Sequence, residues 1–266
     1  MTQISILGCG WLGFPLAKAF IRDGFSIKGS TTSQPKLILL KENNIAPYLI
    51  SLYENEIVGD VTVFLKDSEI LIIDIPPKLR GDSEENFVKK IENLISFVEK
   101  SSIKKVLFVS STSVYGENNS MVTEETIPNP DTESGKQLCQ VEQLLQSNTN
   151  FETTILRFGG LIGKDRHPVR HMSGKIGIEN PNAPVNLIHQ EDCIGIIRKV
   201  VGTQSWNETF NGVHPFHPTR KEYYTQKAEA LQLTLPVFNM EAKNSGKIIS
   251  SHKIEQQLKY TFVAPI

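Results

Sequence analysis

The chain has 266 residues, a net charge of -1 at pH 7 and 39% hydrophobic residues, which suffices for one large core with a smaller lobe. No basic cluster stands out, so we expect no nucleic-acid partner and no anionic-membrane partner. The apolar runs are strand-sized, so we expect neither a signal peptide nor a membrane span. Cys9, Cys139 and Cys193 match no metal-site spacing, which predicts free thiols, a cytoplasmic protein and no bound metal.

The chain opens on a motif typical of dinucleotide-binding proteins. The apolar residues 4–7 predict a strand, and the next six residues read G-C-G-W-L-G before a helical pattern begins. Gly8 allows a tight turn, Gly10 leaves no side chain between the backbone and a pyrophosphate, and Gly13 lets the helix pack closely on the strand. The N-terminus of that helix, with Trp11 and Leu12, would bind the phosphates. The alternative is a glycine-rich turn that binds no nucleotide.

Strand-like apolar runs alternate with helical patterns over the next 150 residues. The run at 69–75 is almost uninterrupted and ends at Pro76 and Pro77, as is typical of a parallel strand buried on both faces. The predicted strands are residues 4–7, 25–29, 47–50, 69–75, 105–109 and 153–158. The predicted helices are residues 15–21, 36–41, 84–100 and 135–145.

This alternation, with short connections, predicts an α/β fold: a doubly wound parallel sheet (Rossmann fold) with a small C-terminal substrate lobe. We assign residues 1–160 to an NAD(P)-binding Rossmann domain and expect 183–202 to return to its sheet. Residues 161–182 and 203–266 are assigned to the smaller, substrate-side lobe.

The end of the second predicted strand indicates which cofactor is bound. NAD-selective folds place an acid about 20 residues after the glycines, to bind the ribose 2′-hydroxyl. This region contains no acid; it offers Ser30, Thr31, Thr32 and Lys36, which would hold a 2′-phosphate. We therefore predict NADP as the cofactor, with NAD as the alternative. The adenine-ribose edge is expected to be shaped by three residues that close the fourth strand: Ile75, Pro76 and Pro77.

After the fifth predicted strand, residues 108–116 read F-V-S-S-T-S-V-Y-G, which resembles the S-S-x-x-V-Y-G segment of extended short-chain dehydrogenases/reductases. That group contains the nucleotide-sugar epimerases and dehydratases. The resemblance implies that Ser111 orients the substrate, with Ser113 nearby, and that Ser110 contacts the cofactor. Tyr115 is interpreted as a packing residue. Later segments that are also similar to the family lie at residues 156–163, 186–193, 209–213, 219–223, 247–250 and 258–260.

The catalytic Tyr-x-x-x-Lys pair of that family is not present at the matching positions. Ser134 stands where the tyrosine belongs and Leu138 where the lysine belongs. Lys136 is two residues from Ser134 and so points well away from it on a helix. In this respect the chain resembles the atypical branch of the superfamily, whose members keep the dinucleotide fold and lose the catalytic motif.

A second dense cluster of functional side chains is the loop at residues 163–171. Arg166 there would bind an anionic or phosphorylated substrate, and His167 could donate the proton that the missing tyrosine does not supply. The alternative is a surface loop with an exposed histidine. His189, three residues before Asp192, is interpreted as structural. Ser111 and His167 are thus the candidate catalytic residues.

Two classes of function follow. One is an NAD(P)-dependent oxidoreductase, epimerase or dehydratase of unusual mechanism, acting on a sugar nucleotide or similar polar substrate. The other is a non-catalytic NAD(P)-binding sensor or regulatory protein. The expected partner is a small-molecule substrate. The sequence leaves open whether the protein forms a homodimer.

Overall fold

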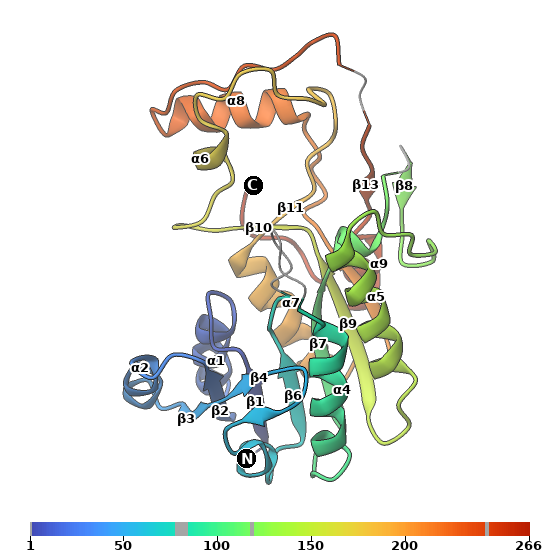
Figure 1. The fold of residues 1–266 in the computed structure, drawn as a ribbon. Helices are drawn as coiled ribbons and strands as arrows, with labels where there is room; N and C mark the ends of the chain where they lie inside the picture. The colour runs from blue at the N-terminus through green and yellow to red at the C-terminus, as the bar shows by residue number, and fades with distance from the viewer. Residues whose placement is uncertain (1, 78–84, 118–119, 243–244) are drawn as a thin grey trace.

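The computed structural model describes residues 2–77, 85–117, 120–242 and 245–266. Its centre is a seven-stranded sheet in the order β12-β9-β7-β6-β1-β2-β3, in which every neighbouring pair is parallel (Figure 1). The doubly wound α/β fold predicted from the sequence is therefore confirmed. The strands of this sheet are β1 (Gln3–Leu7), β2 (Ser26–Thr31), β3 (Ala46–Leu49), β6 (Ile70–Ile73), β7 (Lys105–Ser111), β9 (Glu152–Phe158) and β12 (Thr209–Gly212).

Strand order reverses beside β1. The chain runs outward from β1 to β2 and β3, then returns to place β6 on the other side of β1 and continues outward from there. In open parallel sheets, ligands bind outside the carboxyl ends of the strands at such a reversal. The residues that follow β1 and β6 therefore define the expected site.

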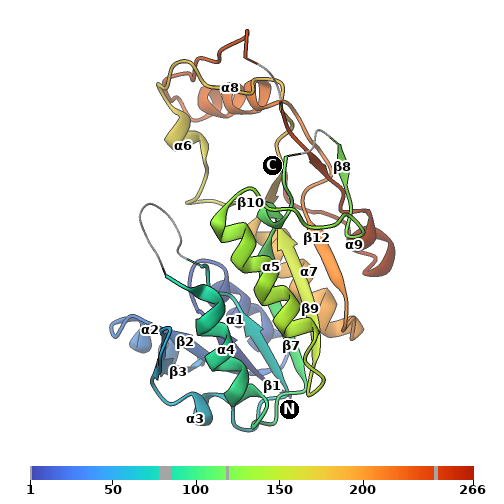
Figure 2. The same ribbon diagram turned by 45° about the vertical axis from the view of Figure 1, so that its right-hand side comes forward.

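Helices cover both faces of the sheet and bury two apolar clusters. On one face lie α1 (Gly13–Arg22) and α7 (Gln190–Thr203), which contribute Leu16, Phe20 and Ile196 to the core. On the other lie α4 (Phe87–Val98) and α5 (Glu133–Gln146), seen in front of the sheet in Figure 2. The remaining elements around the sheet are α2 (Lys36–Glu42), β4 (Ser51–Leu52), β5 (Ile57–Val58), α3 (Val61–Leu65), the 3₁₀ turn η1 (Thr112–Val114), β8 (Met121–Val122), β13 (Ile248–Ile249) and α9 (His252–Gln257).

The predicted helix at 84–100 begins later than expected. The side chain of Asn86 accepts a hydrogen bond from the backbone N–H of Lys89 at 2.9 Å, so Asn86 is the N-cap and Phe87 the first helical residue. Residue 84, with which the prediction began, lies outside the described residues.

A smaller lobe stands beyond the carboxyl edge of the sheet, with α6 and α8 at its far end (Figures 1 and 2). Its own apolar cluster includes Val169, Tyr223 and Phe238. The lobe contains β10 (Gly160–Ile162), α6 (Val169–Met172), β11 (Leu187–His189) and α8 (Arg220–Ala230).

Residues 183–202, which were expected to return to the main sheet, divide into two parts. Strand β11 pairs with β10 in a separate two-stranded sheet, and only the following helix α7 packs back on the main sheet. The position beside β9 is taken by β12, which the prediction had placed in the lobe. A Cβ atom at Gly212 would lie 2.3 Å from the ring of Phe158, so the glycine lets β12 pack tightly on β9.

Candidate functional site

The turn after β1 is closed tightly around two of its glycines. Gly8 has a φ of +105°, and a Cβ atom there would lie 2.3 Å from the main-chain oxygen of Asp74. A Cβ atom at Gly13 would lie 2.2 Å from the oxygen of Gly8. Around Gly10, by contrast, no described atom outside residues 9–11 lies within 4 Å of the place a Cβ would take. The turn therefore presents its open side at Gly10, as pyrophosphate binding requires.

Strand β2 supports this turn through Ser30. The hydroxyl of Ser30 accepts a hydrogen bond from the N–H of Gly8 at 3.0 Å, and its carbonyl accepts one from the N–H of Cys9 at 2.7 Å. The side chain is buried. The structure thus places Ser30, predicted to bind the cofactor, beneath the turn and shows that its hydroxyl holds the turn's backbone.

The other polar residues predicted around the 2′-phosphate divide into two groups. The hydroxyl of Thr31 is buried and accepts a hydrogen bond from the N–H of Ser33 at 3.1 Å. Thr32 and Lys36 are exposed, and Lys36 is the first residue of α2. Both exposed side chains lie just beyond the carboxyl end of β2, where the ribose of a dinucleotide would approach.

Trp11 joins the glycine-rich turn to the loop after β10. Its indole N–H donates to the carboxylate of Asp165 at 2.9 Å, and the guanidinium of Arg166 lies 5.0 Å from its ring centroid. A Cβ atom at Gly163 would lie 2.7 Å from the ring, and Gln190 donates to the carbonyl of Trp11 at 2.6 Å. Arg166, predicted to bind the substrate, is therefore held beside the glycine-rich turn.

Asp74 directly follows β6 and was not among the predicted site residues. Its carboxylate accepts a hydrogen bond from the N–H of Gly13, and burial raises the pKa of this carboxyl to about 8 although the Gly13 N–H and the Arg166 charge oppose the rise. The sequence does contain a signal for this residue: Asp74 is an acid within an apolar run that predicts a strand, and this run ends at the expected site.

The residues after Asp74 line the same edge. The γ2 methyl of Ile75 lies 2.9 Å from the position of a Cβ on Gly8, so this side chain packs on the turn. Pro76 is exposed and Pro77 is half-buried. These placements agree with the predicted role of the segment at the adenine-ribose edge, which stays a prediction.

The side chain of Ser110, predicted to contact the cofactor, points to the face of the sheet that α4 and α5 cover. Side chains alternate along β7, so Ser110 shares the α4 and α5 face with Phe108. Its hydroxyl donates to Glu142 at 2.5 Å, and Glu142 forms a buried ion pair with Arg157 at 2.6 Å. Arg157 in turn donates to the hydroxyl of Tyr115 at 2.6 Å. The hydroxyl predicted to bind cofactor therefore belongs to a buried network.

Ser111 and Ser113 lie where the predicted substrate would approach, beyond the carboxyl end of β7. The hydroxyl of Ser111 accepts a hydrogen bond from the N–H of Ser113 at 3.2 Å and caps η1. Both residues are half-buried. A Cβ atom at Gly135 would lie 2.3 Å from the carbonyl of Ser113, so the start of α5 packs directly against this turn.

Helix α5 contains Ser134 and Leu138, the two positions at which the resemblance noted in the sequence would place a tyrosine and a lysine. Thr132 caps the helix, and Ser134 is half-buried in its first turn. Leu138 is buried in the core beneath the sheet, and Lys136 is exposed.

His167 is held by protein partners on both ring nitrogens. Nδ1 accepts a hydrogen bond from the N–H of Val169 at 3.1 Å, so the proton resides on Nε2, which lies 2.9 Å from the hydroxyl of Tyr223. The two rings stack with centroids 5.6 Å apart. Burial and the charges of Lys227 and Arg170 lower the pKa of His167 to about 4. Among the described residues no hydrogen bond joins His167 to Ser111, the other candidate catalytic residue.

We expect the neutral His167 to make the protein sensitive to acid. An imidazole whose pKa falls on folding is protonated more readily in the unfolded chain, so the free energy of unfolding decreases as pH falls from about 6.5 to about 4. Urea unfolding of the wild type and of His167→Gln across this range measures the contribution. The wild type should lose more stability than His167→Gln, whereas the control His252→Gln, at an exposed histidine, should follow the wild type. Equal losses in the wild type and His167→Gln would contradict the assignment.

His189 and Asp192 have structural roles. The Nδ1 atom of His189 accepts a hydrogen bond from the N–H of Glu191 at 3.2 Å and caps α7. The carboxylate of Asp192 is fully buried and accepts hydrogen bonds from the hydroxyl of Tyr260 and the N–H of Val263, both at 2.8 Å. Both side chains therefore hold backbone or core groups in place.

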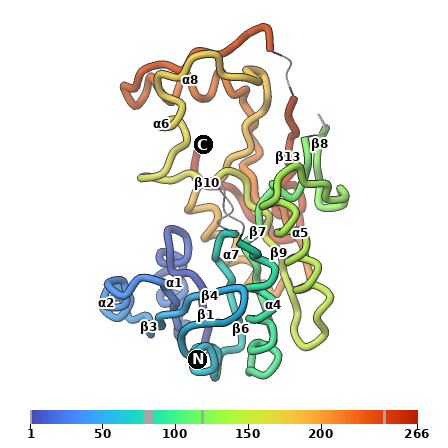
Figure 3. Tube along the Cα trace, in the orientation of Figure 1, coloured from blue at the N-terminus to red at the C-terminus, as the bar shows by residue number. Residues whose placement is uncertain are grey.

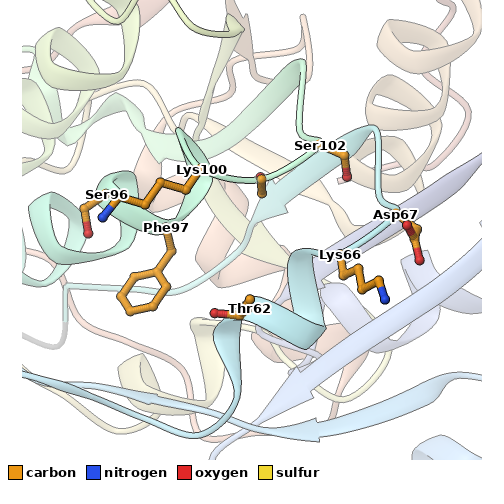
Figure 4. Close-up of a pocket in the computed structure, with 8 residues that line it drawn as sticks. Thr62, Lys66, Asp67, Ser96, Phe97, Lys100 and Ser102 are labelled. Carbon is orange, nitrogen blue, oxygen red and sulfur yellow. The ribbon is translucent and has the colours of Figure 1, made fainter.

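The described chain also contains a cavity away from the glycine-rich turn and shows no group of side chains placed to bind a metal ion. Within the described ranges, no group of three or more His, Cys, Asp or Glu side chains is placed to bind a metal ion. No helix among these residues is long and apolar enough to cross a membrane. A cavity of about 380 Å³ lies between α3 and the end of α4 (Figure 4). Its lining includes Lys66 and Ser102, which precede β6 and β7, so it lies at the opposite edge of the sheet from Gly10.

Comparison with solved structures identifies proteins that share this fold. A structure described as a putative NAD-dependent epimerase/dehydratase from Methylobacillus flagellatus superimposes with a TM-score of 0.79 at 24% identity, over 100% of this chain and 94% of that chain. MoeE5 in complex with UDP-glucose and NAD gives a TM-score of 0.80 at 14% identity, over 99% of this chain and 94% of that chain. The fold is thus the Rossmann-like fold of epimerase/dehydratase-type proteins.

A nearer relationship exists at the level of sequence. The chain is 34% identical to Protein YeeZ of Escherichia coli (strain K12) over 268 residues, which cover 100% of this chain and 97% of that protein. The chain therefore belongs to the family of Protein YeeZ. No protein-family model matches it.

Proposed function

We propose that this protein binds a nicotinamide dinucleotide on the glycine-rich turn and is an atypical, extended short-chain dehydrogenase/reductase. The observation that carries the proposal is the turn itself, closed at Gly8 and Gly13 and open at Gly10, at the reversal of strand order. The N–H groups of Trp11 and Leu12, just before α1, would hold the pyrophosphate, because the N–H groups of Gly13 and Phe14 are bonded to Asp74 and to the carbonyl of Gly10. When bound, the nicotinamide ring accepts or supplies a hydride.

The proposed substrate is a sugar nucleotide or a similar polar molecule. MoeE5, which shares the fold, has been seen with UDP-glucose and NAD. In this chain Ser111 would orient the reacting hydroxyl or carbonyl group, because it lies at the end of β7 beside the expected nicotinamide position. Ser113 would contact the substrate from η1. Arg166 supplies a cation at the same edge.

A non-catalytic role is the second candidate. It is favoured by α5, where Leu138 is buried and Ser134 replaces the tyrosine, and by the engagement of both ring nitrogens of His167. In that case dinucleotide binding would report cofactor level to a partner. Incubating the protein with NADP or NAD and UDP-sugars, and following absorbance of the reduced nicotinamide and product formation by chromatography, separates the two functions. Dinucleotide binding without turnover of any UDP-sugar, aldehyde or ketone favours the sensor.

We expect NADPH to bind at least tenfold more tightly than NADH, a difference of about 1.4 kcal/mol. The reason is that Thr32 and Lys36 are exposed at the end of β2 and no acid is present there to bind a 2′-hydroxyl. Fluorescence titration measures both affinities. Lys36→Ala should remove the preference and Thr32→Asp should reverse it, whereas Lys41→Ala, at an exposed lysine of the same helix, should leave it unchanged. A tenfold preference of the wild type for NADH would overturn the NADP assignment.

A further inference from the structure

Asp74 contacts both closely packed glycines of the dinucleotide turn. Its main-chain oxygen lies 2.3 Å from the position of a Cβ on Gly8, and its Oδ2 atom lies 3.1 Å from that of a Cβ on Gly13. The N–H of Gly13 donates to this carboxylate. An acid from the end of β6 therefore already occupies a backbone donor at the N-terminus of α1.

An ionised Asp74 carboxylate at that position would oppose binding of the pyrophosphate of the proposed dinucleotide. The N–H groups of Trp11 and Leu12, next to Gly13 at the start of α1, are the donors that would bind a pyrophosphate, which is itself anionic. An ionised carboxylate offers only acceptors, so it repels a phosphate oxygen and cannot hydrogen-bond to it. A protonated carboxyl group resolves the conflict, because one oxygen accepts from the Gly13 N–H while the O–H donates to the phosphate.

We propose that Asp74 binds the pyrophosphate of the dinucleotide as a protonated acid, so that binding to the ionised protein takes up one proton from solvent. The proton adds to the Asp74 carboxylate, and no other bond changes. This inference rests on the proposed function, because it concerns the residue beneath the proposed dinucleotide. Asp74 is a cofactor-binding residue in this proposal, and it links cofactor affinity to pH.

The charged and titratable groups around Asp74 leave it as the group that changes charge in the alkaline range. Cys9 of the turn and Cys193 of α7 interact with it electrostatically, but burial raises the pKa of Cys9 to about 12 and the pKa of Cys193 well above its usual value. The guanidinium of Arg166, from the loop after β10, lowers the pKa of Asp74 by its charge. Burial raises the pKa of Asp74 itself to about 8.

The experiment measures the affinity for NADH by fluorescence between pH 6.5 and 9.5, since NADH carries no 2′-phosphate that would titrate. With one proton of pKa about 8, affinity should weaken by roughly 30-fold from pH 7 to pH 9.5. In Asp74→Asn the amide oxygen can accept from Gly13 and the amide N–H can donate to the phosphate, so binding should persist and be independent of pH. Asp60→Asn is the matched control: Asp60 is an exposed carboxylate that caps α3, and this variant should keep the wild-type profile.

A second measurement does not depend on any variant. Calorimetric titration of the wild type with NADH at pH 8.5, in two buffers of different protonation enthalpy, gives the number of protons taken up. We expect about 0.8 proton per dinucleotide, the ionised fraction of a group with a pKa of about 8.

The outcomes separate the two hypotheses. Uptake of no proton, an affinity equal at pH 7 and 9.5, or a wild-type slope in Asp74→Asn would overturn the role of Asp74 and leave the dinucleotide site intact. Failure of the folded wild type to bind NADH or NADPH at any pH would overturn the proposed function, and this inference with it.

Discussion

Gly10→Val is expected to fold as the wild type does and to lose at least 100-fold in affinity for the dinucleotide, or about 2.7 kcal/mol. Outside residues 9–11, no described atom lies within 4 Å of the place where a Cβ would stand at Gly10, and this glycine is not among those with positive φ. A valine therefore fits the protein but fills the space through which a pyrophosphate must approach. Fluorescence titration with NADPH measures the loss, and circular dichroism verifies the fold.

A second glycine variant provides the control. Gly202 in α7 also has no atom within 4 Å of its Cβ position, and it is exposed. Gly202→Val should bind the dinucleotide as the wild type does. A folded Gly10→Val protein with normal affinity would remove the basis of the proposed site.

The second large effect concerns stability. Arg157→Met should lower the free energy of unfolding by about 3–5 kcal/mol, because it leaves the buried carboxylate of Glu142 without its cation. Three hydrogen bonds of 2.6–3.1 Å join the guanidinium to Glu142, and both side chains are buried. The hydroxyl of Tyr115 loses the hydrogen bond that Arg157 donates to it, while Ser110 keeps Glu142 as its acceptor.

An exposed ion pair of similar geometry tests whether burial causes the effect. Arg198 and Asp23 also form a 2.6 Å pair, but Arg198 is largely exposed. Arg198→Met should cost less than about 1 kcal/mol. Urea unfolding compares the two variants. A cost for Arg157→Met that is no larger than that for Arg198→Met would contradict the view of this network as a central element of the fold.

Local sequence patterns were sufficient to predict most of the fold. The glycine-rich turn, the apolar run that forms β6 and the alternation of strands with helices all depend on periodicity and turn chemistry, which neighbouring residues determine. The edge of the sheet was not predictable in this way. Whether β11 or β12 lies beside β9 depends on which strand packs against Phe158, and Gly212 permits that contact from a distance of 54 positions along the chain.

The candidate site was predicted in part for the same reason. The open turn at Gly10 follows from its motif, but the partner of Trp11 lies 154 positions away at Asp165. Ser110 was predicted to contact the cofactor, but side chains alternate along β7, and this alternation directs Ser110 to the face of the sheet that α4 and α5 cover. Asp74 was not predicted as a site residue because it stands within an apolar run, and such a run indicates a buried strand and not a charged site.

The last residues of the chain connect the two parts of the molecule mechanically. Asp192, at the start of α7 on the sheet, accepts hydrogen bonds from Tyr260, Val263 and Ala264, and Ile266 is buried in the apolar cluster of α6 and α8. The end of the chain accordingly lies between the lobe and the sheet (Figure 3). Residues 260–266 are thus attached both to the sheet and to the lobe, and they act as a tether between them. The distance that the lobe can move away from the glycine-rich turn is therefore limited by how far these seven residues can extend.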